Sequence, residues 1–207
     1  MTVGAIILAA GKGERVGQDK VMLALGDKPV WQWSYDTFQA HSEVSKVGIV
    51  VAPSQVETVR KAAPEAAFVV AGGDSRQSSA LAGIEAMDTA LVLVHDAARP
   101  FVSSELISRV IEAAATSGAA APYMPVTDTI RDRDSLEIIP RERLAAMQTP
   151  QAAKRNLLIE AHAAASSDVT DDLALLQGIG IQPTLVEGET ENRKLTYSSD
   201  WPPAQLE

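Results

Sequence analysis

Three short segments of this 207-residue chain place glycine or alanine beside charged side chains, each directly after an apolar run. They read Ala9-Ala10-Gly11-Lys12-Gly13-Glu14-Arg15, Gly72-Gly73-Asp74-Ser75-Arg76 and His95-Asp96-Ala97-Ala98-Arg99-Pro100. Glycine lets backbone N–H groups approach a phosphate closely, and nearby cations stabilise the charge on phosphoryl oxygens during transfer. These residue types therefore indicate a phosphate-binding site that could carry out chemistry at phosphorus.

The first glycine loop does not fit either of two common nucleotide-binding motifs. A dinucleotide-binding loop reads G-x-G-x-x-G, but here Gly17 comes one position late, and Ala52 and Pro53 stand where an acidic residue would hold the ribose. The chain also contains no G-x-x-x-x-G-K-[ST] sequence, which excludes a P-loop. A glycine loop followed by Arg15 and Lys20 is compatible with transfer at phosphorus. The alternative is a plain strand-to-helix turn with solvated cations.

Asp96 follows the apolar run Leu91–Val94, so we expect its carboxylate at the end of a buried strand. Mg²⁺ is commonly held by one or two carboxylates together with substrate phosphates, which makes Asp96 a candidate metal ligand. A helix cap or an ion-pair partner for Arg99 is the alternative. We predict that the neighbouring His95 is structural, because a phosphate nucleophile is already anionic near neutral pH and needs no general base.

Apolar runs and amphipathic segments alternate along most of the chain. We expect strands at 3–8, 46–52, 67–71, 91–94 and 184–187, and helices beginning at 29 and spanning 54–63, 76–87, 103–118, 154–165 and 171–177. This order predicts an α/β fold with a doubly wound, mostly parallel, Rossmann-like sheet. Ligands bind such sheets beyond the carboxyl ends of the strands, where all three loops would meet.

The segment from Pro125 to Met147 departs from this alternation. It carries short β-like pieces at 129–131 and 137–139 around the charged turn Asp132-Arg133-Asp134-Ser135, and we expect it to protrude as a β-arm. No internal repeat or linker is evident, so we interpret residues 1–207 as a single domain with this arm.

Composition bounds the function classes. The formal net charge is −9, whereas a general nucleic-acid binder is usually basic. No apolar run reaches the ~20 residues that span a bilayer, which predicts a soluble protein. The chain has no cysteine, which excludes disulfides and thiolate sites and fits a cytoplasmic location.

Taken together and in order, the motifs resemble one family. Leu8-Ala9-Ala10-Gly11-x-Gly13-x-Arg15 with Lys20 is similar to the glycine loop of sugar-nucleotide pyrophosphorylases. The remaining motifs are Gly72-Gly73-Asp74-x-Arg76-x-x-Ser79, Val94–Pro100, Pro125-Val126-x-Asp128-Thr129, Gln148-Thr149-Pro150-Gln151, Thr170-Asp171-Asp172, Val186-Glu187-Gly188 and Asn192-x-Lys194-x-Thr196. This set resembles the 2-C-methyl-D-erythritol 4-phosphate cytidylyltransferase family over nearly the whole chain.

The resemblance implies a Rossmann-like nucleotidyltransferase fold that uses CTP and Mg²⁺ to modify a sugar-alcohol phosphate. It implies that the nucleotide is bound by Leu8, Ala9, Ala10, Gly11, Gly73, Asp74, Ser79, Asp96, Ala97 and Arg99, with Asp96 also near the metal. Arg15, Lys20 and Lys194 would stabilise the transition state. Substrate-binding roles fall on Thr129, Arg141, Thr149 and Thr170, the first two reaching from the arm into the neighbouring subunit's site. A homodimer with shared active sites would follow.

Three other functions remain as alternatives. A ribitol-5-phosphate cytidylyltransferase would share most of these motifs and differ in the sugar pocket. A non-catalytic nucleotide-binding regulatory subunit would be expected to lack one of Arg15, Lys20, Asp96 or Lys194, and all four are present. A metal-dependent glycosyltransferase would need an Asp-x-Asp motif; Asp132-Arg133-Asp134 matches it, but we interpret this turn as a solvated loop.

Overall fold

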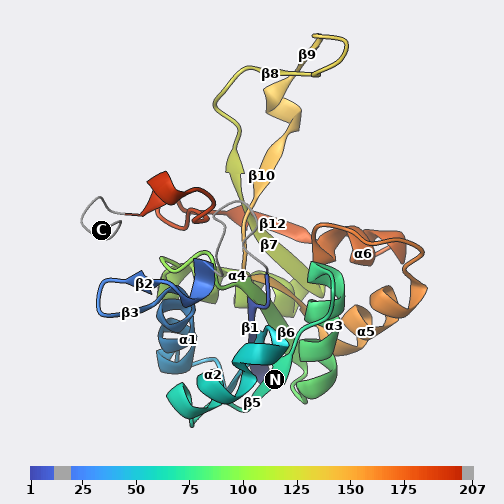
Figure 1. The fold of residues 1–207 in the computed structure, drawn as a ribbon. Helices are drawn as coiled ribbons and strands as arrows, with labels where there is room; N and C mark the ends of the chain where they lie inside the picture. Colours follow the sequence, from blue (N-terminus) through green and yellow to red (C-terminus); the bar gives the residue numbers. More distant parts are fainter. Residues whose placement is uncertain (12–19, 202–207) are drawn as a thin grey trace.

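The computed structural model describes residues 1–11 and 20–201, so Arg15 lies outside the described part of the chain. Its centre is an eight-stranded sheet in the order β10-β7-β11-β6-β1-β4-β5, with β12 paired to β7 (Figure 1). The strands of this sheet are β1 Val3–Ala9, β4 Lys46–Val51, β5 Phe68–Ala71, β6 Leu91–Asp96, β7 Ala119–Pro125, β10 Ala145–Met147, β11 Gln151–Lys154 and β12 Thr184–Glu187. The four strands β1, β4, β5 and β6 run parallel to one another, and β12 runs parallel to β7. β10 pairs antiparallel with β7, and β11 pairs antiparallel with both β6 and β7. The predicted mostly parallel α/β sheet is confirmed.

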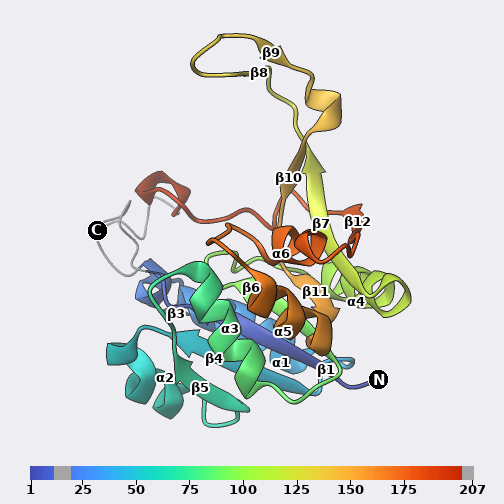
Figure 2. The ribbon, with the colours of Figure 1, turned by 90° about the vertical axis from the view of Figure 1, so that its right-hand side faces the viewer.

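Helices cover both faces of the sheet (Figures 1 and 2). They are α1 Val30–Ala40, α2 Val56–Ala62, α3 Arg76–Ala86, α4 Ser104–Ser117, α5 Arg155–Ala164 and α6 Asp172–Gly178, with short 3-10 turns at Lys20–Met22, Pro53–Gln55, Arg141–Arg143 and Ser198–Asp200. Ala5 and Ile7 of β1 pack in the core shared with α1, α2 and α4, whereas Ile6 and Leu8 pack in the core shared with α3, α5 and α6. Because β1 is buried on both faces, its sequence is a continuous apolar run rather than an alternating one. No helix in the described ranges is long and apolar enough to cross a membrane.

The helix α4 shows how local sequence sets these elements. The Ser103 side chain accepts a hydrogen bond from the backbone N–H of Leu106 and so caps the helix. Its buried residues Leu106, Ile107, Val110, Ile111 and Ala114 have helical spacing and form one stripe against the sheet. Burying a large aliphatic side chain stabilises the fold by about 1.5–3 kcal/mol. Gly118 ends the helix with a φ of 92°, a left-handed conformation that favours glycine.

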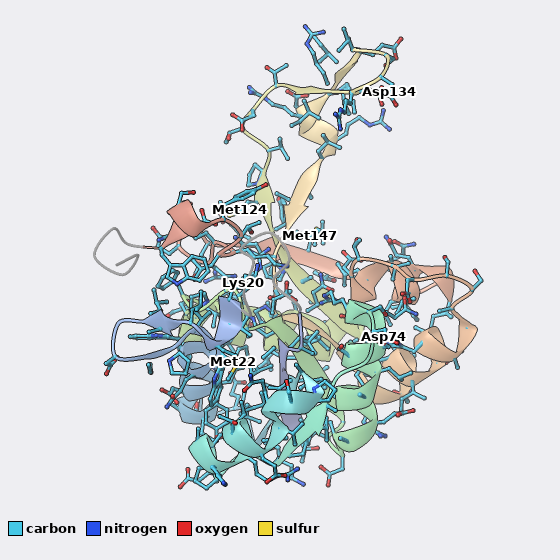
Figure 3. The ribbon with its side chains drawn as sticks, viewed as in Figure 1. Lys20, Met22, Asp74, Met124, Asp134 and Met147 are labelled. Atoms are coloured by element: carbon cyan, nitrogen blue, oxygen red, sulfur yellow. The ribbon has the colours of Figure 1, made fainter. Side chains whose placement is uncertain are left out.

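The segment after Pro125 protrudes from the body as predicted (Figure 1). At its base β7 and β10 pair antiparallel, with Met124 opposite Ala146 (Figure 3). Beyond them β8 Ile130–Arg131 and β9 Ile138–Ile139 form a separate two-stranded sheet. Asp134 lies at the tip (Figure 3). Oδ1 of Asp132 accepts hydrogen bonds from the backbone N–H groups of Asp134 and Ser135. This Asp-x-Asp sequence therefore stabilises an exposed turn, as expected, far from the ends of the core strands.

Several strands were not predicted. β7 continues the parallel direction beyond β11, and β10 and β11 are the two strands of this sheet that run antiparallel to their neighbours. β2 Ala24–Leu25 and β3 Lys28–Pro29 form a small hairpin. The expected helix at 54–63 begins later, because Pro53–Gln55 form a 3-10 turn before α2. The expected strand at 91–94 extends two residues further, so that Asp96 is its last residue.

Candidate functional site

The candidate site lies beyond the carboxyl ends of β1 and β6. These strands are parallel, with Leu8 opposite Asp96, and the N–H of Ala97 donates to the carbonyl of Leu8 at 3.0 Å. The loops that follow the two strands therefore start side by side, as expected for a ligand site in a parallel sheet. Leu8, Ala9 and Ala97 are buried in this edge, whereas Gly11 is exposed.

Asp96 receives a cation on each of its carboxylate oxygens. The Lys194 Nζ lies 2.6 Å from Oδ2, and the Arg76 Nε lies 3.3 Å from Oδ1. Burial alone would raise the pKa of the Asp96 carboxyl, but Lys194 and Arg76 outweigh burial and hold that pKa below its ordinary value. Asp96 is thus a stable anion at the end of a buried strand.

His95 is held as a structural residue, as predicted. Its ring is fully buried and packs against Phe38 with a centroid separation of 5.0 Å. Nε2 lies 3.1 Å from the carbonyl of Arg99, and Nδ1 lies 3.1 Å from the hydroxyl of Thr149. Burial lowers the pKa of His95 to about 4, so the ring is neutral near pH 7. The Thr149 hydroxyl also accepts the backbone N–H of Asp96 at 3.1 Å, which places Thr149 under the site.

Arg99 joins three segments at the edge of the site. Its NH1 donates to the carbonyl of Asn192 at 2.8 Å, and its NH2 donates to the carbonyl of Met147 at 3.1 Å. Met147 belongs to β10 at the base of the arm (Figure 3), and Asn192 precedes Lys194 in the C-terminal segment. Arg99 therefore fixes the arm and the lysine-bearing segment to the loop after β6.

Lys20 approaches the same C-terminal segment from the other side. Its Nζ donates to the carbonyl of Leu195 at 2.8 Å, and the N–H of Leu195 donates to the carbonyl of Ala98 at 2.8 Å. Lys20 and Lys194 are thus brought together although they are 174 positions apart in the sequence. Figure 3 shows Lys20 beyond the ends of the central strands.

The loop after β5 closes against the loop after β1. A Cβ at Gly72 would lie 2.4 Å from the Cβ of Ala10 and 2.7 Å from the Ser79 hydroxyl, so only glycine allows this approach. The Ser79 hydroxyl donates to the carbonyl of Ser75 at 2.8 Å, inside the first turn of α3. Gly73 and Asp74 remain exposed at this edge.

The other expected substrate residues are exposed, and two of them lie on the arm. Thr129 and Arg141 are on the arm, where the Arg141 guanidinium donates to the carbonyl of Thr127 and lies 3.7 Å from the carboxylate of Glu142. Thr170 is exposed just before α6. Within one chain the structure does not bring Thr129 or Arg141 to the site.

The residues present fit a magnesium ion that is held mainly by phosphates. Within residues 1–11 and 20–201 no three His, Cys, Asp or Glu side chains form a metal-binding group. Asp96 offers a single carboxylate, and one or two carboxylates together with substrate phosphates are the usual ligands of Mg²⁺. The cations now on Asp96 show that this carboxylate attracts positive charge.

Several residues that build the site had no assigned role at the sequence level. Asn192 is fully buried and donates to the carbonyl of Thr149 at 2.9 Å and to Oε1 of Gln148 at 3.2 Å. Asp172 is buried and accepts from Arg76 at 3.0 Å. All of them lie inside motifs that the sequence had marked, so position in a motif was the available signal. Their side-chain partners are far away in sequence and could not be deduced from it.

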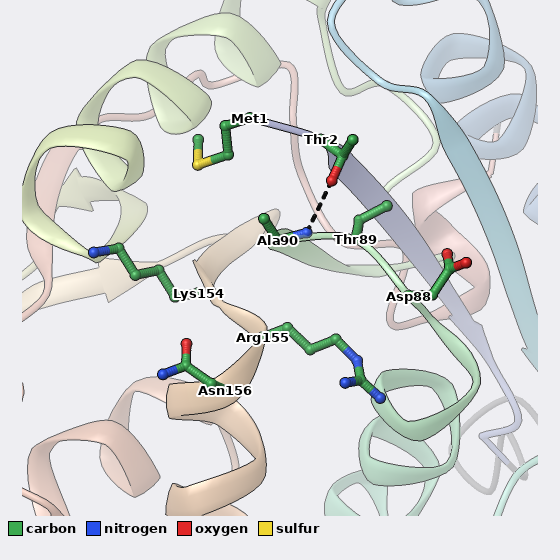
Figure 4. Close-up of a pocket in the computed structure, with 8 residues that line it drawn as sticks. All are labelled: Met1, Thr2, Asp88, Thr89, Ala90, Lys154, Arg155 and Asn156. Carbon is green, nitrogen blue, oxygen red and sulfur yellow. Dashed lines mark hydrogen bonds between the residues drawn. The ribbon is translucent and has the colours of Figure 1, made fainter.

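A separate pocket of about 580 Å³ opens at the opposite ends of the same strands. Figure 4 shows its lining residues, which are Met1, Thr2, Asp88, Thr89, Ala90, Lys154, Arg155 and Asn156. It lies at the start of β1 and β6, where parallel sheets do not place their active sites.

Comparisons with known proteins agree with this geometry. The family described as "IspD: 2-C-methyl-D-erythritol 4-phosphate cytidylyltransferase" matches residues 3–206. The 2-C-methyl-D-erythritol 4-phosphate cytidylyltransferase of Thermus thermophilus is 39% identical over 207 residues, covering 97% of this chain and 94% of the relative. The bifunctional enzyme IspD/IspF of Bradyrhizobium sp. is also 39% identical, and the match covers 95% of this chain and 54% of that protein. The chain therefore spans about half the length of its bifunctional relatives.

Solved structures lead to the same family. The Thermus thermophilus enzyme superposes with a TM-score of 0.83 at 37% identity, covering 97% of this chain and 95% of that one. The bifunctional IspDF from Campylobacter jejuni gives a TM-score of 0.88 at 30% identity, covering 97% of this chain and 53% of that one. The match over nearly the whole length, in sequence and in fold, shows that this chain belongs to the IspD family of 2-C-methyl-D-erythritol 4-phosphate cytidylyltransferases.

Proposed function

We propose that this chain transfers CMP from CTP to 2-C-methyl-D-erythritol 4-phosphate and releases pyrophosphate, a step of non-mevalonate isoprenoid biosynthesis. The observation that carries the proposal is the convergence of Lys20, Asp96 and Lys194 at the carboxyl ends of β1 and β6. Family membership names the substrates of its relatives, and the geometry provides the charges that such a transfer needs.

The reaction is an in-line displacement at the α-phosphorus of CTP. A phosphate oxygen of the sugar alcohol forms the new P–O bond while the bond to the bridging oxygen of pyrophosphate breaks, and the bonding electrons leave with pyrophosphate. The nucleophile is anionic, so no residue needs to remove a proton, which agrees with a buried and neutral His95. Lys20 and Lys194 stabilise the charge that develops on the phosphoryl oxygens.

The proposed site would include a Mg²⁺ ion bound together with the nucleotide. Asp96 would hold the ion together with the phosphates of CTP, and the ion would supply neutralisation of phosphate charge. The loop residues Gly11, Gly73 and Asp74 are exposed, so a nucleotide could reach them. Their contacts with cytosine and ribose follow from the family resemblance.

The proposed assembly is a homodimer in which each arm completes the partner's site. The support is that Thr129 and Arg141 lie on an arm that projects from the body, while Leu136 and Ile138 near its tip are 63% and 59% exposed (Figure 1). Large apolar side chains in such a position favour burial against another surface. The cytoplasmic location expected from composition remains a prediction.

The testing experiment measures pyrophosphate release from CTP with and without Mg²⁺, using methylerythritol 4-phosphate and ribitol 5-phosphate side by side. We expect clear preference for methylerythritol 4-phosphate and none of this activity in EDTA. Preference for ribitol 5-phosphate would keep the mechanism and change the substrate. No release with either substrate would favour the non-catalytic nucleotide-binding subunit and would reject the proposal.

A matched pair of lysine variants shows whether the assigned site performs the reaction. Lys20→Ala removes a cation from the site, whereas Lys61→Ala removes an exposed cation from α2, away from it. We expect Lys20→Ala to reduce kcat roughly a hundredfold while CTP affinity changes far less, because the cation acts mainly on developing charge. Lys61→Ala should behave like wild type.

A further inference from the structure

Arg76 joins two carboxylates that come from distant parts of the chain. Its Nε lies 3.3 Å from Oδ1 of Asp96, and its NH1 lies 3.0 Å from Oδ2 of Asp172. Asp96 ends β6, Asp172 starts α6 and Arg76 starts α3. One guanidinium therefore connects the strand end that carries the site to two helices on the same face of the sheet (Figure 2).

The far end of this connection is buried. The Asp172 side chain is 2% exposed, and its backbone N–H donates to Oε1 of Gln151 at 3.1 Å. Its Oδ1 faces the ring of His162, with Nε2 at 3.4 Å. A buried carboxylate enclosed in this way can hold Arg76 in one place, because losing the partner would leave an uncompensated buried charge.

At the near end of the connection, the two carboxylate oxygens of Asp96 have different partners. Oδ1 faces Arg76, whose side chain is 24% exposed and is anchored by Asp172. Oδ2 faces Lys194, a flexible side chain that is 37% exposed. The planar guanidinium presents its donors in a fixed fork, whereas a lysine ammonium is a mobile point charge. Oδ2 is thus the side from which a partner can leave.

We propose that Arg76 is a positioning residue of the nucleotide site: anchored by Asp172, it fixes the orientation of Asp96 so that Oδ2 is presented to the incoming Mg²⁺ and CTP phosphates as Lys194 is released. This inference rests on the proposed function and adds to it a residue that does not itself touch substrate. It also gives the buried Asp172 a defined task, which is to anchor Arg76.

The test measures CTP binding by calorimetry in Mg²⁺ and in EDTA, so that no turnover is required. We expect Mg²⁺ to strengthen CTP binding to wild type, and Arg76→Gln to lose about ten- to a hundredfold of that gain, the usual effect of removing a group that orients a metal ligand. Arg109→Gln is the matched control, because Arg109 pairs with Glu189 at 2.9 Å outside the site. An unchanged gain from Mg²⁺ in folded Arg76→Gln overturns the proposal.

Two further variants separate positioning from general structural support. Arg76→Lys keeps the positive charge but lacks the planar, forked guanidinium. Compared with Arg76→Gln, it should therefore recover more of the thermal stability than of the strengthening of CTP binding by Mg²⁺. As a single substitution, Asp172→Asn should weaken the strengthening of CTP binding by Mg²⁺. In a protein that already carries Arg76→Gln, it should cause no further loss of this effect. An equal loss in both backgrounds would show that Asp172 does not act through Arg76.

The outcomes remain distinct from those of the proposed function. If wild type does not bind CTP with Mg²⁺, the proposed function fails. If wild type binds and Arg76→Gln keeps the full gain, only the role of Arg76 fails. Should Arg76→Gln unfold at the assay temperature, the double variant Arg76→Gln with Asp172→Asn carries the same measurement, since it leaves no unpaired charge at position 172.

Discussion

The ammonium of Lys194 lies 2.6 Å from Oδ2 of Asp96, so the lysine expected at the transition state rests on the carboxylate expected at the metal. The two residues are 98 positions apart and meet because Leu195 hydrogen-bonds to the loop after β6. Without nucleotide, each neutralises the other. Binding of CTP with Mg²⁺ would exchange this pair for two new ones, which frees Lys194 for the phosphates.

Replacing Lys194 should therefore affect catalysis much more than stability. The lysine side chain is 37% exposed, and ion pairs of this exposure contribute up to about 1 kcal/mol to the free energy of unfolding. We expect Lys194→Gln to lower kcat roughly a hundredfold, since a charge aimed at the transition state is lost. Steady-state kinetics and thermal melts of one preparation check both parts. A melt far below that of wild type with normal kcat would contradict the assignment.

The free energy of unfolding should depend on pH partly because His95 is buried. Its pKa of about 4 in the folded protein lies below the ordinary 6.5, so the unfolded chain binds the proton more strongly. The stabilising contribution is complete above pH 6.5 and is lost as pH falls from 6.5 towards 4. Between pH 7 and pH 5 this amounts to about 2 kcal/mol. Denaturant unfolding in EDTA at these two pH values measures it.

A variant without the imidazole isolates this contribution. His95→Asn should be less stable than wild type at pH 7, because the ring packs against Phe38 and contacts the Thr149 hydroxyl. Its stability should nevertheless change less than that of wild type between pH 7 and pH 5. Equal changes in the two proteins would show that the pKa of His95 is the same in the folded and unfolded states, which would contradict a lowered pKa.

The sequence predicted those parts of the fold whose pattern is local. The run from Val3 to Ala9 is apolar on both faces of the sheet, so it identified a buried parallel strand and the loop beyond it. Asp96 was correctly placed at a strand end for the same reason. The spacing of the apolar residues in α4 likewise predicted that helix, and Gly118 predicted where it ends.

The unpredicted strands form against local preference. β7 reads Ala-Ala-Ala-Pro-Tyr-Met-Pro, and alanine and proline are both poor strand formers. It is a strand because β11, β10 and β12 all pair with it. Such tertiary pairing has no local pattern. The same limit applies to the site: 96 residues separate Arg76 from Asp172, so no spacing could predict their contact.

Asn192 should be critical for placing Lys194. It is fully buried and ties the C-terminal segment to Gln148 and Thr149 through its side-chain amide. Asn192→Ala leaves the Thr149 carbonyl without this partner and should lower the free energy of unfolding by about 1–3 kcal/mol. CTP affinity should fall as well, because Lys194 is two residues away.

Asn156→Ala, in the pocket of Figure 4, is the matched control, and we expect it to change the free energy of unfolding by about 0.5 kcal/mol or less. Equal melts for the two variants would contradict the role of Asn192.

Mixed dimers test whether the arm completes the partner's site. Arg141→Ala should raise the KM for the sugar phosphate while CTP affinity stays near that of wild type, because Arg141 lies on the arm and not beside Asp96.

For the mixed dimers, subunits carrying Arg141→Ala and subunits carrying Lys20→Ala are unfolded, mixed in equal amounts and refolded together. If sites are shared, a mixed dimer combines the intact arm of one subunit with the intact Lys20 of the other in one of its two sites. Since about half of the dimers are mixed, about a quarter of the wild-type activity should return. Activity no higher than that of the separate variants would show that each chain uses its own arm or none.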